Sequence, residues 1–192
     1  MVPQVFLKGH PNFYSELVMR YEFAHKLSGD WSFEETKIIN DVMTFISNPI
    51  IGDPVTEIGR YISKITGVKY LLIGRFSGPG NDKVKTICFF NKDQKLANIT
   101  YSLKNTPCYS VYQQHVCYYP YGVQEEFPED ADLVIMGVHS YLGAALHDYA
   151  GEAIGLIVLL NDTTIENPGL IDYLFSLVSP TLEKQLAAGL AA

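Results

Sequence analysis

The amino-acid sequence predicts an α+β domain in which an antiparallel sheet carries helices on one face. Apolar residues follow a helical period of about 3.6 up to residue 67, and a strand period of 2 begins at Val68. A hairpin pattern returns over residues 140–160, and a helical stripe follows it near the end of the chain. Because the strands are grouped between helices, an antiparallel sheet is favoured over a parallel one.

Three helices are expected before the sheet. The first carries an apolar stripe formed by Phe13, Leu17, Tyr21 and Ala24. Ser32 and Glu35 have the spacing of a capping box, which predicts a second helix. Asp53 followed by Pro54 supplies an N-cap and a first-turn proline for the third, with Gly67 as its C-cap. We place a helical extension over residues 1–50 and the main domain over residues 51–192.

The strands are expected in two groups. Alternation predicts one strand from Val68 to Phe76 and another over residues 96–103. Between them, a strand is predicted to place four side chains on one face, namely Val84, Thr86, Cys88 and Phe90. Residues 140–147 and 153–160 form the later hairpin. The last helix carries the stripe Leu170, Leu174, Val178, Leu182 and Leu186, and Pro180 is expected to kink or break it.

Between the two groups, residues 105–138 lose any clear period, and we call them the cover segment. Seven tyrosines lie in or beside it. Thr106-Pro107 is typical of the start of a short helix, and Phe127-Pro128-Glu129-Asp130 is typical of another. We therefore expect an irregular layer with two short helices, lying against the sheet.

Composition removes several classes of function. The net charge of −7 gives the chain no general attraction to nucleic acid or anionic lipid. No apolar run approaches the ~20 residues that span a bilayer, and the first residues lack the pattern of a secretory signal. Three cysteines do not suggest a disulfide framework. We expect a cytoplasmic protein.

Several segments resemble a GAF domain. They are Tyr-Leu-Leu-Ile-Gly-Arg-Phe at residues 70–76, the cover segment with Thr106-Pro107-Cys108, the run Ser-Tyr-Leu-Gly-Ala-Ala-Leu-His-Asp at 140–148, and Gly151 to Leu159. The middle of the chain is similar to GAF modules of bacterial sensor histidine kinases and diguanylate cyclases. The resemblance implies a sheet of about six antiparallel strands, packed by the N- and C-terminal helices on one face and by the cover segment on the other.

The resemblance also implies a function. It suggests a non-catalytic, small-molecule-sensing module of a bacterial signal-transduction protein, such as a two-component system or a diguanylate cyclase. The ligand and any cofactor are unknown, and no kinase or cyclase output domain is present in this chain. End helices of such modules commonly pair, so a homodimer through the terminal helices is expected. A pure dimerisation module with a degenerate pocket is an alternative.

The cysteines raise an enzymatic alternative. Cys108 and Cys117 resemble the paired thiols of free methionine-(R)-sulfoxide reductases, a branch of the same family. The catalytic thiol of that branch would fall within residues 131–138, which contain no cysteine; the third, Cys88, lies upstream. A reductase needs an attacking and a resolving thiol, so we expect no catalytic residue.

Metal and cofactor patterns are weak. Cys108, His115 and Cys117 could supply zinc ligands, with Cys88 or His139 as a fourth, but their spacing matches no compact zinc motif. Haem ligation through His115 or His139 has no other support. Phosphate-loop, dinucleotide, bilin-attachment and cyclic-nucleotide patterns are absent from the sequence. We expect no metal site.

A pocket beneath the cover segment is the expected ligand site, because tyrosine combines an apolar ring with a polar tip. Alternate strand positions should contribute Phe90, Tyr101 and Tyr141. Tyr109, Tyr112 and Tyr118 are expected to close the pocket from above. The predicted ligand-binding set is completed by Cys108, Cys117 and His139.

Overall fold

The computed structural model describes residues 31–189. Its helices are α1 (Phe33–Ser47), α2 (Pro54–Thr66), the 3-10 turn η2 (Pro79–Asn81), α3 (Pro107–Gln114), α4 (Val123–Glu126), α5 (Ala131–Ile135) and α6 (Pro168–Ala188). Its strands are β1 (Tyr70–Ser77), β2 (Lys83–Asn91), β3 (Gln94–Lys95), β4 (Thr100–Ser102), β5 (Val116–Tyr119), β6 (Ser140–His147) and β7 (Ala153–Asn161). They form one antiparallel sheet in the order β3-β2-β1-β7-β6-β5, with β4 also paired to β2.

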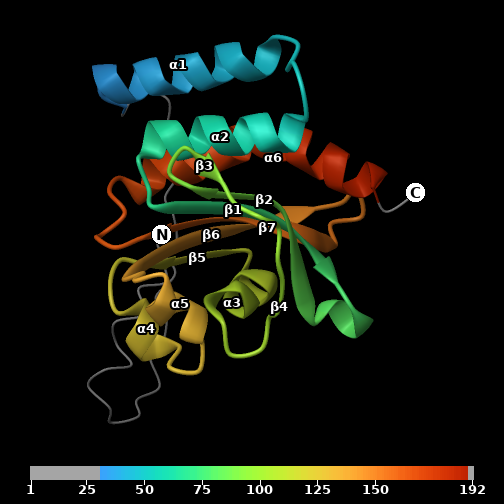
Figure 1. Ribbon diagram of the computed structural model, residues 1–192. Coiled ribbons are helices and arrows are strands. Elements are labelled where there is room, and N and C mark those ends of the chain that lie inside the picture. Colours follow the sequence, from blue (N-terminus) through green and yellow to red (C-terminus); the bar gives the residue numbers. More distant parts are fainter. Residues whose placement is uncertain (1–30, 190–192) are drawn as a thin grey trace, which may run out of the picture.

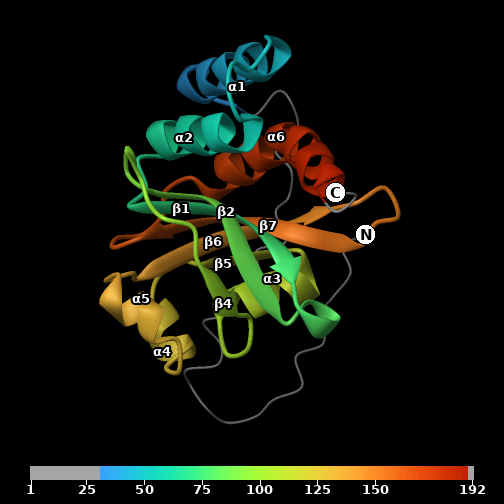
Figure 2. The ribbon, with the colours of Figure 1, turned by 45° about the vertical axis from the view of Figure 1, so that its right-hand side comes forward.

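The molecule is layered around this sheet. Helices α2 and α6 lie against one face, and α1 lies over them as a further helical layer (Figure 1). Helices α3, α4 and α5 lie on the opposite face, which the turned view shows as well (Figure 2). Each face has its own apolar cluster, so the sheet is covered on both sides. The predicted α+β fold, with helices on one face and the cover segment on the other, is confirmed.

The expected helix starts are confirmed where the structure describes them. Ser32 and Glu35 form a reciprocal capping box at α1, and the Asp53 carboxylate accepts the Thr56 N–H at α2. Gly67 ends α2 in the left-handed region, with φ of 65°. The helix expected near residues 13–28 lies outside the described residues.

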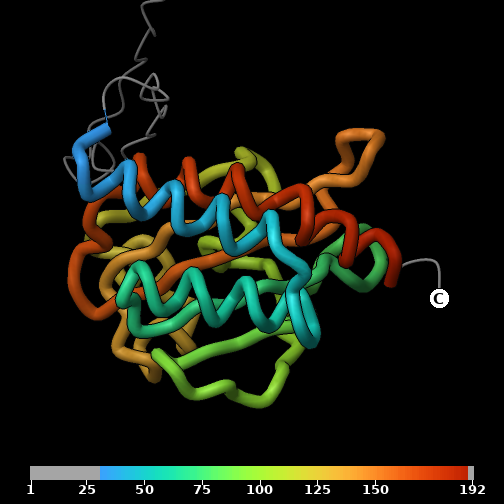
Figure 3. The backbone as a smooth tube through the Cα atoms, turned by 90° about the horizontal axis from the view of Figure 1, so that it is seen from above, coloured from blue at the N-terminus to red at the C-terminus, as the bar shows by residue number. Residues whose placement is uncertain are grey.

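Helix α1 is tied to both helices beneath it, as seen from above in Figure 3. The Phe45 ring stacks on Tyr61 of α2 at 4.3 Å between centroids, and Trp31 lies 5.4 Å from Tyr173 of α6. The predicted boundary at residue 50 therefore separates segments that pack together, and it stays a prediction.

A β-bulge changes which residues of β2 face the cover segment. Ile73 pairs with Cys88 but Gly74 pairs with Thr86, so Ile87 is an extra residue in β2. Alternation resumes one residue out of step: Val84 faces the cover side, whereas Cys88 and Phe90 belong to the helix-side core. The prediction that these residues share one face is wrong for this reason.

Phe90 is consequently not on the pocket side. It is fully buried, and the Arg60 guanidinium lies 5.2 Å from its ring centroid. Its neighbour Phe89 takes the position on the cover face.

The cover segment contains a strand that its composition conceals. Residues 116–119 form β5, which pairs with β6 at the sheet edge. Strand alternation sends Tyr118 to the helix side, where its hydroxyl donates to the Ile165 carbonyl at 2.7 Å. The prediction that Tyr118 closes the pocket from above is therefore wrong.

Other boundaries differ more modestly. Of the strand expected over residues 96–103, only residues 100–102 form a strand, β4; the short β3 precedes the expected range. The short helix at Pro107 is confirmed, and α5 begins at Ala131 after a turn containing Pro128.

Helix α6 continues through Pro180 without a break. The five stripe residues that begin at Leu170 and end at Leu186 are buried against the sheet. That stripe is therefore not available to a partner. Within residues 31–189, no helix is both long and apolar enough to span a membrane.

Candidate functional site

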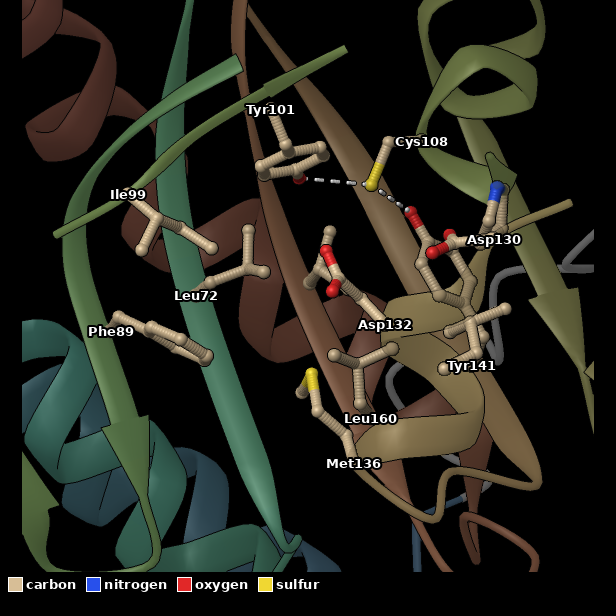
Figure 4. Close-up of a pocket in the computed structure, with 13 residues that line it drawn as sticks. Leu72, Phe89, Ile99, Tyr101, Cys108, Asp130, Asp132, Met136, Tyr141 and Leu160 are labelled. Atoms are coloured by element: carbon tan, nitrogen blue, oxygen red, sulfur yellow. Dashed lines mark hydrogen bonds between the residues drawn. The ribbon is translucent and has the colours of Figure 1, made fainter. Parts of the chain in front are cut away.

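A small pocket lies between the sheet and the cover segment (Figure 4). Its volume is about 50 Å³, which is room for roughly four water molecules. The floor comes from four strands and consists of Leu72, Phe89, Tyr141, Val158 and Leu160. The remaining wall consists of Ile99, Tyr101, Pro107, Cys108, Asp130, Asp132, Leu133 and Met136. The lining is mostly apolar, with its polar groups at two places.

The first polar place is the Cys108 thiol, held between two phenols. The Tyr141 hydroxyl donates to Sγ at 3.4 Å, and the Tyr101 hydroxyl lies 3.2 Å from the same sulfur (Figure 4). Burial raises the pKa of Cys108 to about 11 and that of both tyrosines well above its ordinary value. The three groups are therefore neutral at pH 7 and satisfy one another.

A glycine permits this arrangement. A Cβ added to Gly143 in β6 would lie 2.6 Å from the Tyr141 hydroxyl and 2.8 Å from a methyl of Val111 in α3. Such distances are shorter than ordinary van der Waals contacts. Gly143 thus lets α3 approach the sheet and leaves space for the Tyr141 side chain to reach Cys108.

The second polar place is acidic. Asp130 precedes α5, Asp132 lies in its first turn, and both line the pocket. The pKa of Asp130 is raised, first by burial and then by the charge of Asp132; the backbone N–H groups of Asp132 and Leu133 oppose this in part. Asp130 is half-buried and Asp132 is exposed.

The structure brings together three of the residues predicted for ligand binding, namely Tyr101, Cys108 and Tyr141. Tyr112 instead packs edge-on against Phe76, at 5.0 Å between ring centroids. Tyr109 is 44% exposed on the far side of α3.

Two further members of the predicted set lie away from the pocket. Cys117 is buried in β5 on the cover side without lining it. His139 is exposed just before β6, and its backbone N–H donates to the Asn161 carbonyl.

Sequence reasoning missed Phe89 and the two carboxylates. The signal for Phe89 was its place beside Phe90 in an apolar pair, but its direction depends on the bulge at Ile87. Asp130 and Asp132 are acidic residues in the region of a predicted short helix. The sequence did not show that the start of this helix lies over the pocket.

The cysteines do not gather into a chemical centre. All three are free and buried. Cys88 lies on the helix side, where a Cβ on Gly59 would come within 2.5 Å of its sulfur, and burial raises its pKa to about 12. In the described part of the chain, no three His, Cys, Asp or Glu residues are grouped to hold a metal ion.

The similarity of this chain to known proteins is found in their solved structures. No family model matches the chain, and no curated protein matches its sequence. A mutant chromophore-binding domain of the Stigmatella aurantiaca bacteriophytochrome, in the Pr state, is 14% identical with a TM-score of 0.61. The match covers 85% of this chain and 63% of that one.

Two isolated GAF domains are similar over nearly their whole length. The GAF domain of an Acinetobacter phosphoenolpyruvate-protein phosphotransferase is 11% identical, with 84% of this chain and 98% of that one covered and a TM-score of 0.61. The A. aeolicus nlh2 GAF domain in an inactive state is 10% identical, with 79% and 94% covered and a TM-score of 0.54. The chain therefore has the GAF fold.

Proposed function

We propose that this chain is a regulatory module that senses a small molecule in the pocket beneath the cover segment. The observation that carries the proposal is the pocket itself, a mostly apolar cavity with polar groups at two places. The GAF fold adds support by analogy alone, because one fold hosts many functions and function depends on the site. Signalling requires that the ligand bind two arrangements of the protein with different affinities.

The size of the pocket limits the ligand. Drug-sized molecules occupy cavities of about 300–1,000 Å³, whereas this one holds about 50 Å³. A ligand of about four or five non-hydrogen atoms fits without rearrangement. A larger one requires the cover segment to move, and α4 and α5, of 4 and 5 residues, are short helices of that segment outside the sheet.

Catalysis by the thiols has less support. A buried thiol with a pKa of about 11 is only ~0.01% ionised at pH 7, and Cys108 is already held by two tyrosines. We therefore propose a non-catalytic module rather than a sulfoxide reductase.

We further propose that the module belongs to a cytoplasmic bacterial signal-transduction protein whose output domain lies outside this chain, and that it forms a homodimer. The buried stripe of α6 excludes that surface as the dimer contact. Helix α1, which lies outermost in the helical layers, offers exposed Phe33 and Met43 instead.

Amide hydrogen exchange tests the site. A library of small molecules, screened first by native mass spectrometry, should contain one that slows exchange in residues 99–108 and 130–141. Leu160→Phe, which fills the floor of the pocket, should abolish this protection. Val134→Phe, at a position 61% exposed on α5, is the matched control. Protection confined to α1 and α2 would contradict the proposal.

A further inference from the structure

The charged side chains that line the pocket, among the described residues, are all of one sign. Asp130 and Asp132 are its charged lining residues; within residues 31–189, no lysine, arginine or histidine lines it. In Figure 4 the Asp132 carboxylate points into the space beside Leu72 and Leu160, and the Asp130 carboxylate lies beside Tyr141. A ligand entering the pocket therefore meets negative charge against apolar walls.

Among residues 31–189, neither carboxylate forms an ion pair. In the described part of the chain the ion pairs are Arg60 with Glu57 and Lys69 with Asp162. The Lys69 ammonium also donates to the carbonyl of Met136, at 2.9 Å, behind the pocket wall, but it forms no ion pair with Asp130 or Asp132. Burial and then the charge of Asp132 raise the pKa of Asp130, and the backbone N–H groups of Asp132 and Leu133 oppose this in part. Two like charges beside an apolar wall repel each other, and a bound cation reduces that repulsion.

The thiol and phenols cannot supply that cation. Cys108, Tyr101 and Tyr141 are neutral when protonated and negative when not, and their hydrogen bonds are spent on one another. They suit the apolar end of a ligand, together with Phe89 and Val158 of the floor.

From this distribution we propose that the pocket selects a small organic cation, an ammonium group on a short apolar body. The inference rests on the proposed sensing function and names its ligand class. The ammonium donates hydrogen bonds to Asp132 and Asp130, while the apolar body lies against Leu72, Phe89 and Val158. A carboxylate or phosphate of the same size would face two like charges, so anionic metabolites and nucleotides are rejected.

The test uses three probes that share a four-carbon chain and differ in charge: n-butylamine, 1-butanol and butyrate. Each is titrated into the ¹⁵N-labelled protein at pH 7.5, and amide shifts are followed by NMR. We expect butylammonium to shift amides of residues 99–108 and 130–141 with an affinity about tenfold above that of butanol. Butyrate should leave them unchanged.

Variants separate the charge from the cavity. Asp132→Asn should weaken butylammonium about tenfold while changing butanol affinity by less than about threefold. Asn can replace Asp before a helix, so Asp130→Asn should act in the same direction without loss of α5. Glu125→Gln removes the same charge from exposed α4, outside the pocket lining, and should change neither affinity.

The outcomes distinguish the two proposals. Butanol or butyrate binding as well as butylammonium, or an amine affinity unchanged in Asp132→Asn, would overturn the cation preference and leave the pocket as a binding site. Failure of all three probes to shift the lining amides at tens of millimolar would overturn the cation preference. The sensing function would be overturned separately, if no member of the screened library slows amide exchange in these residues.

Discussion

At the residue scale, the site depends on groups whose neighbours decide their chemistry. Cys108 would be an ordinary thiol in solution, but burial raises its pKa to about 11, although the hydrogen bonds with Tyr101 and Tyr141 act in the opposite direction. Gly143 contributes by lacking a side chain, because Val111 and Tyr141 occupy the space a Cβ would need. Two predictions follow from these contacts.

Burial of Cys108 should make the protein less stable at high pH. Its pKa rises from 9.0 to about 11 on folding, so between these values the unfolded chain has lost a proton that the folded one retains. Stability therefore falls as pH rises through this window, by about 1.4 kcal/mol per pH unit for one group. Urea unfolding at several pH values should show a shallower fall in Cys108→Ala than in the wild type. Parallel profiles would contradict the assigned burial.

Gly143→Ala should destabilise the cover side. The new methyl meets Tyr141 and Val111 at 2.6 and 2.8 Å, and such overpacking costs about 1–3 kcal/mol. Urea unfolding measures the change. Gly169→Ala at the start of α6 is the control, because nothing lies within 4 Å of its added Cβ, and it should be neutral or slightly stabilising. Equal changes in the free energy of unfolding for the two substitutions would show that close packing at Gly143 does not make it intolerant of a side chain.

At the element scale, the sheet holds the end of α6 through one side chain. Arg75 of β1 donates to the carbonyl of Leu186 and, at 2.8 Å, to that of Gly189. The last carbonyls of a helix have no partner within it, and a cation at that end is favourable. Strand β1 also contributes Leu72 to the pocket. Arg75 thereby connects this strand to the C-terminal end of α6.

Arg75→Met should loosen the last turn of α6. Hydrogen bonds from a charged group contribute about 1.5–3 kcal/mol when buried, and Arg75 is half-buried, so we expect a loss of about 1–2 kcal/mol. Amide exchange should accelerate at residues 187–189 while β1 stays protected. Arg60→Met on α2, which removes a partly exposed pair with Glu57, is the control. Unchanged amide exchange at residues 187–189 would show that the hydrogen bonds from Arg75 do not stabilise the end of α6.

At the scale of the whole molecule, packing decides which surfaces remain for partners. The apolar stripe of α6 is buried against the sheet. Helix α1, Phe33–Ser47, lies outermost, and its Phe33 and Met43 side chains are 82% and 47% exposed. Large exposed apolar side chains are candidates for protein contacts. A homodimer through the terminal helices would therefore use α1.

The protein should sediment as a dimer at high micromolar concentration. Phe33→Glu and Met43→Glu should each shift it toward monomer, because a buried charge opposes association. Ile51→Glu, 92% exposed but beyond the end of α1, should not. A wild-type monomer in sedimentation velocity at the highest concentration would rule out the homodimer.

Local sequence patterns were sufficient to predict the layers, the helix starts and the later hairpin, because capping and periodicity are local properties. Ser32 with Glu35, Asp53 with Pro54 and the alternation in β6 and β7 need no distant partner to be recognised. The sequence also placed Tyr101, Cys108 and Tyr141 in the candidate site, since their segments were assigned to the sheet and its cover.

Long-range contacts in the folded chain determine the side of the sheet on which each side chain lies. One extra residue at Ile87 turned Phe90 toward the helices and Phe89 toward the pocket, and pairing with β6 made residues 116–119 a strand that carries Tyr118 away. The tertiary structure also decided that Asp130 and Asp132 meet the floor of the sheet. Register, bulges and loop placement arise from contacts between residues distant in the chain, and no local pattern records them.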